Sequence, residues 1–458
     1  MKRKLLLMAA LVAGTIGANA QMAWNVQNSM FTAASRGIND FSVVDSNTVW
    51  AVAYDGSGSN ATIRDIAKTT NGGATWKASK ITATGLAATH GLANLSAIDA
   101  DTAYAAVYPA GSSVAPQGVY KTTDGGTTWK KVSTGAFTNA SASFINVVHF
   151  FNAKNGIAMG DPAAGYFEIY TTDNYGASWV RVADSSIGYT PVAGEYGTVG
   201  YYGDFDSTII YPTNFGNILV SKDLGHTWTL GTSPLMGVVN TGIPSITCSS
   251  KNDFWAVLSN TDSASSTLIF SIDGGLSWNS SGADTLGNLV YFSSIEHVPG
   301  TPATYFLTSA NSTSGAVGSA YTEDGSTWIN IDAVQHTACQ FADINNGWSG
   351  GFNTAITASG GIFKWGSVRV ATGVASNKVE NFEVYPNPSN GTYYVKATVK
   401  GASSIKVMDV TGRVVFAKEY PTQSLLYTSF DLSNQAQGVY MVEVREGNNV
   451  SVQKIVKQ

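Results

Sequence analysis

The sequence is poor in charged residues and rich in glycine. Asp, Glu, Lys and Arg together make up 12% of the 458 residues, and the small number of Lys and Glu argues against a largely helical protein. Glycine occurs 48 times, which suits short strands joined by tight turns. The formal net charge is −5 with no basic stripe, which argues against nucleic acid as a partner. These features predict an acidic, all-β protein.

Cysteine is nearly absent, with only Cys248 and Cys339 in the whole chain. They belong to no CxxC motif and no His/Cys cluster, so we expect no structural metal site and no cofactor. A disulfide would be possible in an oxidising compartment. Alignment of the repeats described below places the two cysteines in non-adjacent units, which favours buried free thiols.

Long apolar runs are also missing, apart from one at the N-terminus between Leu5 and Ile16. The basic triplet Lys2-Arg3-Lys4 precedes this run and Ala18-Asn19-Ala20 follows it as a small-residue cleavage site. We therefore expect residues 1–20 to be a secretory signal peptide. A membrane anchor is the alternative, but the run is short for a span, and we expect no transmembrane segment after signal cleavage.

A short phrase recurs six times, in the form Ser/Thr-x-Asp/Asn-x-Gly-x-Ser/Thr-Trp with a degenerate last copy. Successive tryptophans are 49 to 53 residues apart, a period typical of propellers and solenoids. The acidic or amide residue and the tryptophan of the copies are Asn71 and Trp76, Asp124 and Trp129, Asn174 and Trp179, Asp223 and Trp228, Asp273 and Trp278, and Asp324 and Trp328.

This phrase resembles the Asp-box, or BNR repeat, of sialidases, sortilin-type receptors, xyloglucanases and photosystem II assembly-factor propellers. The Asp or Asn oxygen can accept a backbone N–H two residues on, glycine allows a positive φ, and tryptophan covers the hairpin with an apolar face. The resemblance implies a β-propeller and leaves the function open. The boxes would lie on outer turns of different blades, so we expect a structural role and no facing pair of catalytic carboxylates.

The repeats also predict the number of blades. Each repeat divides into four strand candidates, and a seventh unit between Ala338 and Trp365 supplies three strands without a box. The segment Ala23–Val26 resembles the residues that follow each box, so we expect it to complete the seventh unit and close the ring. We predict a seven-bladed β-propeller over residues 21–366, in preference to six or eight blades.

The composition changes after the propeller. Residues 367–379 are mostly small and polar and are expected to form a linker. The last segment contains three landmarks in order, namely Tyr385-Pro-Asn-Pro388, Asp409-Val-Thr-Gly-Arg413 and Lys454-Ile-Val-Lys-Gln458. This segment resembles the type A C-terminal sorting domain of the type IX secretion system, a small immunoglobulin-like β-sandwich. An ordinary adhesive sandwich is the alternative.

The resemblance implies a partner and a destination. Residues 380–458 would engage the type IX secretion machinery, and the chain would be exported through both membranes. In that family the sorting domain is then removed, and the protein is released or attached at the cell surface.

Candidate binding residues come from the loops that would line the mouth of the propeller channel. The most distinctive local motif is Gly160-Asp161-Pro162, which places an acid in a turn. This acid could bind a ligand, or it could serve only to cap the turn. His149 lies on an inner strand, where a hydrogen-bonded core histidine and a ligand-binding histidine are both possible. The full set is Arg36, Arg64, His149, Asp161, Tyr189 and Glu195, with Asp55, His90, Tyr108 and Tyr166 nearby.

The scarcity of arginine argues against a sialidase. Such an enzyme needs three guanidinium groups that clamp a substrate carboxylate. Residues 21–365 contain only Arg36, Arg64 and Arg181, and Arg181 follows Trp179 on an outer strand.

Two functional classes remain. The favoured one is a secreted or surface-displayed propeller that binds a glycan, a peptide or a surface polymer without chemistry. The alternative is a polysaccharide hydrolase or lyase with Asp161, Glu195 and His149 near its centre. The enzyme requires two of these groups to converge with a perturbed pKa, and the sequence assigns no catalytic residue.

Overall fold

The structure is a computed structural model of the chain. It describes residues 22–59, 61–109, 116–139, 142–234, 236–260, 265–280, 294–310, 317–353, 360–367, 379–422, 424–447 and 449–458. The expected signal peptide and nearly all of the expected linker lie outside these ranges. The chain divides into two compact units, Met1–Val368 and Arg369–Gln458.

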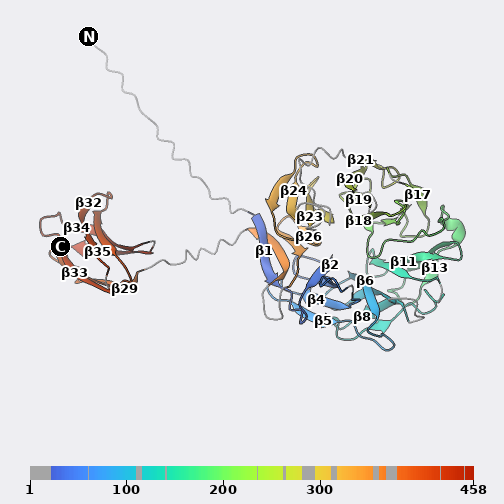
Figure 1. Cartoon of the computed structure of the whole chain (residues 1–458), viewed down its shortest axis with the longest axis horizontal. Helices are drawn as coiled ribbons and strands as arrows, with labels where there is room; N and C mark the ends of the chain where they lie inside the picture. The colour runs from blue at the N-terminus through green and yellow to red at the C-terminus, as the bar shows by residue number, and fades with distance from the viewer. Residues whose placement is uncertain are drawn as a thin grey trace, which may run out of the picture. The chain divides into compact units, whose positions relative to one another are not determined.

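Both units are built from β-strands, and the described residues contain no α-helix, only the short 3-10 helix η1 (Asp184–Ser186) (Figure 1). The prediction of an all-β chain is therefore confirmed. In the described residues, no helix has the length and apolar character needed to cross a membrane.

The first unit consists of four-stranded antiparallel sheets, seven of them in its described residues. Six follow a simple meander in chain order, because each repeat supplies four short strands separated by turns. Their strands are β2 (Arg36–Val43), β3 (Val49–Asp55), β4 (Asp65–Thr69) and β5 (Lys77–Lys80); β6 (His90–Ala97), β7 (Ala103–Pro109), β8 (Gly118–Thr122) and β9 (Lys130–Lys131); β10 (Ile145–Phe150), β11 (Gly156–Ala163), β12 (Tyr166–Thr172) and β13 (Val180–Arg181); β14 (Gly203–Phe205), β15 (Thr208–Pro212), β16 (Ile218–Ser221) and β17 (Thr229–Gly231); β18 (Thr241–Cys248), β19 (Phe254–Asn260), β20 (Ser265–Ser271) and β21 (Asn279–Ser280); and β22 (Ser294–His297), β23 (Tyr305–Ser309), β24 (Gly318–Thr322) and β25 (Ile329–Asp332).

The remaining sheet joins the two ends of the unit. It has the order β1 (Met22–Asn28), β28 (Gly361–Ser367), β27 (Asn346–Gly350) and β26 (Cys339–Asp343). β1 runs antiparallel to β28 with Trp24 opposite Trp365, and the two indole rings are 5.2 Å apart between centroids. The Trp24 Nε1 also donates to Ser319 Oγ at 3.1 Å, which ties this sheet to its neighbour.

The sheets are arranged in a ring (Figure 1). The first strands of neighbouring sheets contact one another, as β2 contacts β6 and β18 contacts β22, so the first strands surround the axis. Apolar cores lie between adjacent sheets; one combines Trp50 of β3 with Tyr120 of β8 and the box tryptophan Trp129. Burial of these large side chains, at about 25 cal/mol per Å² of apolar surface, is the main stabilising contribution.

The Asp-box turns have a hydrogen-bond pattern that differs from the expected one. In the second copy the Asp124 Oδ1 accepts the N–H groups of Thr127 and Thr128, three and four residues on. The Thr122 Oγ1 donates to Asp124 Oδ1 at 2.9 Å and accepts the buried Gly126 N–H at 2.9 Å. The first hydroxyl of the phrase therefore orients the acid and satisfies the buried glycine amide.

The same pattern places the acids at the surface. The hydrogen bond from the Thr128 hydroxyl is the largest influence that lowers the pKa of Asp124 to about 2, so this carboxylate stays ionised as a turn acceptor. The degenerate last copy is one residue shorter, and Asp324 accepts from residues 326 and 327, two and three residues on. This geometry agrees with a structural role for the boxes.

The second unit contains two β-sheets that share one buried core. One sheet has the order β29 (Glu380–Tyr385), β30 (Thr392–Thr398) and β33 (Leu425–Asp431), and the other has the order β32 (Val414–Tyr420), β31 (Ser403–Asp409), β34 (Gly438–Glu446) and β35 (Asn449–Lys457). Alternating residues of β30 and β34, such as Val395 and Val442, are fully buried in this core. The period of two is typical of sheets with one solvated face.

Both cysteines are free thiols, with Cys248 half-buried and Cys339 buried. The alternative of a disulfide between them is therefore not realised.

We predict that Thr122→Val lowers the free energy of unfolding by about 1–3 kcal/mol, because the isosteric change leaves the buried Gly126 amide without its acceptor. Urea unfolding monitored by tryptophan fluorescence measures the change. The control Thr123→Val alters an exposed neighbour and should stay within about 0.5 kcal/mol of the parent. Equal effects of both variants would contradict the assigned role of the Thr122 hydroxyl.

Candidate functional site

Ionisable side chains from the first strands of four sheets converge on the axis of the ring. Asp40 lies on β2, His149 on β10, Asp204 on β14 and Glu296 on β22. The His149 Nε2 lies 3.5 Å from Asp204 Oδ2, and the charges of Asp40 and Asp204 both act on Glu296. Three acids and one histidine therefore share the central lumen.

A turn that precedes β14 packs against this lumen. A Cβ atom added to Gly200, where φ is +79°, would lie 2.7 Å from the Ala93 carbonyl oxygen of β6, so the turn approaches β6 closely. Tyr202 follows, and its hydroxyl lies 3.2 Å from His149 Nδ1. The turn that ends in Tyr202 thus packs against β6 and against His149 at the axis.

Partial burial at the axis shifts the pKa values of the lumen groups. Burial raises the pKa of Asp40 to about 7, although the N–H of Phe41 opposes the shift. Burial also raises the pKa of Glu296 well above its usual range, with the neighbouring acids adding to the effect. Burial lowers the pKa of His149 more than the Asp204 charge raises it. Among the described residues, no group of three or more His, Cys, Asp or Glu has the geometry to hold a metal ion.

His149 is therefore a packed axial residue. The residue is only 8% exposed, with Phe151 edge-on at 4.6 Å and Tyr202 at 5.0 Å between ring centroids. It does not line the pocket described below.

The two arginine candidates are held by other protein groups. Arg64 is 4% exposed, and its guanidinium donates to the carbonyl oxygens of residues 81, 87 and 90. Arg36 forms ion pairs with Asp55 at 3.1 Å and with Asp65 at 2.8 Å. Arg64 thus fixes a loop, and Arg36 presents an already neutralised charge. His90 is fully buried and accepts the Ala87 N–H.

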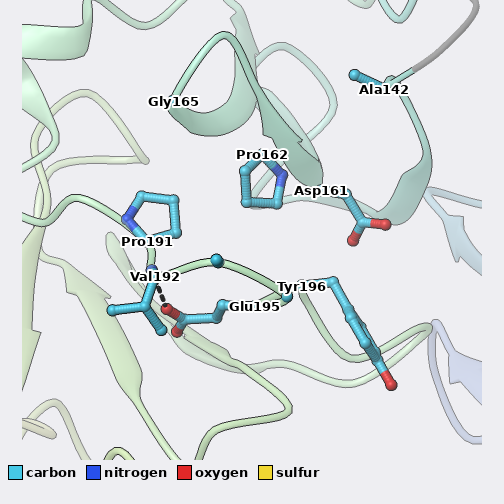
Figure 2. A pocket seen from close by; sticks show the side chains of 10 residues that line it. Ala142, Asp161, Pro162, Gly165, Pro191, Val192, Glu195 and Tyr196 are labelled. Carbon is cyan, nitrogen blue, oxygen red and sulfur yellow. Dashed lines mark hydrogen bonds between the residues drawn. The ribbon is translucent and has the colours of Figure 1, made fainter.

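A pocket of about 410 Å³ is lined by both Asp161 and Glu195, which come from different segments, and the Glu195 carboxylate turns back toward Val192 of its own loop (Figure 2). One side is formed by Ala142, by Asp161 and Pro162 of β11, and by Gly165 in the turn to β12. The other side is formed by residues 191–196, in the segment between η1 and β14.

Asp161 reaches this pocket because of a β-bulge. The register between β11 and β12 shifts at this point: Gly160 pairs with Glu168, and Pro162 pairs with Phe167. Asp161 is the additional residue, and a bulge redirects the side chain of such a residue. Its Oδ1 accepts from Asn146 Nδ2 at 2.6 Å and from Gly197 N at 3.1 Å.

Burial raises the pKa of Asp161 to about 6, although these two hydrogen bonds oppose the shift. The carboxyl group therefore titrates near neutral pH while it faces a pocket. In the described residues its Oδ2 makes no hydrogen bond.

Glu195 has a different environment. Its Oε2 accepts from Tyr189 Oη at 2.6 Å and from Val192 N at 3.0 Å, and its Oε1 accepts from Asn217 Nδ2 at 2.9 Å. Its side chain is almost completely buried, at 4% exposure. Glu195 and the predicted binding residue Tyr189 thus fasten the 189–196 loop to Asn217, the residue that precedes β16.

Several polar residues of these sites carry no signal in the sequence motifs. Asn146 orients Asp161 and Asn217 orients Glu195, yet each looks like an isolated amide near an apolar strand. The lumen acids Asp40, Asp204 and Glu296 were not among the predicted site residues. One sequence pattern could have indicated these polar residues, namely a polar residue inside an apolar inner strand. Asn146 within Ile145–Val148 is an example.

We predict that Asp40→Asn stabilises the protein at pH 8 and has little effect at pH 4. The pKa of an aspartate is near 3.9 in the unfolded chain, whereas that of Asp40 is about 7 in the folded protein. Between pH 4 and pH 7 the folded state therefore binds more protons than the unfolded state. The free energy of unfolding consequently falls as the pH rises through this range. Thermal unfolding at both values measures the difference between variant and parent.

The control for this experiment is Asp173→Asn, which removes the same charge at an exposed position. It should shift the melting temperature equally at both pH values. A stabilisation by Asp40→Asn that is independent of pH would contradict an enclosed, protonated Asp40.

The C-terminal unit matches a known family. Residues 383–458 match the secretion system C-terminal sorting domain. This match confirms the resemblance to a type IX sorting domain and indicates export to the cell surface or to the outside. None of the curated proteins shows significant similarity to the sequence.

The ring resembles solved propellers. One is YCF48 bound to D1 peptide, with 14% identity and a TM-score of 0.50, covering 75% of this chain and 95% of that chain. Another is the GH74 xyloglucanase from Xanthomonas campestris, with 12% identity and a TM-score of 0.47, covering 94% of this chain and 69% of that chain. Identities this low bear on the fold alone. The chain therefore carries a β-propeller followed by a type IX C-terminal sorting domain, the part that marks it for export.

Proposed function

We propose that the chain is an exported, seven-bladed β-propeller with a removable C-terminal sorting domain of immunoglobulin-like type. The seven four-stranded sheets of the first unit support the blade count. The two sheets around one core in the second unit support the sandwich. Residues 1–20 would serve as signal peptide, residues 21–366 as propeller, residues 367–379 as linker and residues 380–458 as the partner of the secretion machinery.

We propose further that the propeller binds an extracellular glycan in the Asp161 pocket. The observation that carries this proposal is a half-buried carboxyl group with an unused oxygen at the wall of a 410 Å³ pocket. Such a pocket is of a size to hold a sugar unit. Pro162, Pro191 and the half-exposed ring of Tyr196 add apolar surface, which suits the C–H faces of a sugar.

Binding is favoured over hydrolysis because only one of the two acids is free to act. Glycoside hydrolysis requires a general acid and a second carboxyl group that activates water or attacks the sugar. Glu195 accepts three hydrogen bonds from protein groups, which leaves it little capacity for either task. His149 lies outside the pocket.

A hydrolase or lyase remains the second candidate because of Asp161 itself. A pKa of about 6 suits a general acid at neutral pH. Product analysis on every glycan that binds separates the two candidates: turnover that disappears in Asp161→Asn would establish the enzyme.

We predict that the purified protein binds specific glycans on an array and that Asp161→Asn weakens binding at least tenfold without turnover. The matched variant Asp173→Asn removes an exposed acid of the same sheet, in the turn after β12, and should bind like the parent. Thermal unfolding checks that both variants fold. An array without hits, or hits that Asp161→Asn leaves unchanged, would contradict a glycan site at this pocket.

A further inference from the structure

We infer that the glycan bound in the Asp161 pocket carries a free, protonated amine, so that the ligand is a hexosamine unit without an N-acetyl group. This inference rests on the proposed function and specifies its ligand. It follows from the charges of the pocket, from the hydrogen bonds that they already make, and from the shape of the lining.

The pocket carries negative charge that no basic residue of its lining offsets in the part of the chain that the structure describes. There the lining includes Asp161 and Glu195 but no Lys, Arg or His. The groups that donate to the two carboxyls are all neutral, namely amide N–H groups, a side-chain amide from each of two asparagines and one tyrosine hydroxyl. Arg181, on the outermost strand of the same sheet, pairs instead with Asp184 at 3.1 Å.

A site with this charge discriminates between ligands. A cation gains from the Asp161 carboxylate, whereas a carboxylate or sulfate group would meet repulsion in a partly desolvated place. Neutral hydroxyl groups could still bind, but they would leave the charge of Asp161 uncompensated. Electrostatic complementarity thus favours an ammonium group over the other common substituents of glycans.

The free oxygen of Asp161 defines where the ammonium would lie. Oδ1 already accepts from Asn146 and Gly197, so Oδ2 is the acceptor that faces a ligand. An ammonium group has three donors and no acceptor, and its hydrogen bond to a carboxylate is charge-assisted and stronger than a neutral one. The fixed Asp161 side chain would require little reorganisation on binding.

The opposite wall is held in place in the same way. The Glu195 side chain binds Val192 N within its own loop, and Asn214 binds both Tyr196 N and Gly194 O. The 191–196 loop is therefore preorganised, and its lining residues combine the apolar Pro191 and Val192 with the polar Glu195 and Tyr196. This mixture suits a sugar ring, which has C–H faces and hydroxyl edges, better than the long methylene chain of a lysine.

The test is isothermal titration calorimetry of the full-length protein with two defined probes at pH 6.5. These are the β-1,4-linked hexamer of glucosamine and its fully N-acetylated counterpart. We expect the free-amine hexamer to bind at least tenfold more tightly and to lose most of this advantage between 50 and 500 mM salt. Asp161→Asn should remove the preference, and Asp173→Asn should keep it.

The outcomes separate this inference from the proposed function. Equal binding of the two hexamers would overturn the amine, while the glycan site would stand. Tighter binding of hexalysine than of the glucosamine hexamer would also overturn it, in favour of a peptide ligand. Failure of every array glycan and of both hexamers would overturn both proposals. The comparison of probes on the parent protein remains decisive even if Asp161→Asn does not fold.

Discussion

The pairing of β1 with β28 is the constraint on which the rest of the propeller depends. These strands come from opposite ends of the first unit, and their register places Trp24 opposite Trp365. The pairing covers the free edge of β28, which would otherwise expose unpaired backbone groups. It also brings the first and last sheets into contact, as the packing of β2 against β26 shows, and so fixes the positions of the inner strands around the axis.

One segment links the axis to the pocket. The chain between β13 and β14 first contributes Glu195 and Tyr196 to the pocket and then places Gly200 and Tyr202 against the lumen. Gly197 lies between them and donates to Asp161. A ligand at the pocket would therefore contact a segment that also packs against the lumen, where the Tyr202 hydroxyl lies 3.2 Å from His149 Nδ1.

The sequence predicted much of the fold because its repeat is local. The box phrases, the tryptophan spacing and the Ala23–Val26 segment depend on residues close in the chain. The expected hydrogen bond of the box was wrong for the second copy, since Asp124 accepts from three and four residues on, whereas Asp324 of the last copy does accept from two residues on. The site was harder to predict: Asp161 was visible as an acid before proline, but the saturation of Glu195 depends on Asn217, 22 residues away, and the lumen cluster exists only once distant strands meet.

We propose that a ligand binds between Asp161 and the 191–196 loop. Hydrogen–deuterium exchange of the full-length protein, with and without the glucosamine hexamer, tests it most directly. We expect the ligand to slow exchange at the amides of residues 192–197, including Val192 and Gly197, whose N–H groups donate to the two pocket acids. Unchanged exchange in this loop, or protection confined to other sheets, would contradict it.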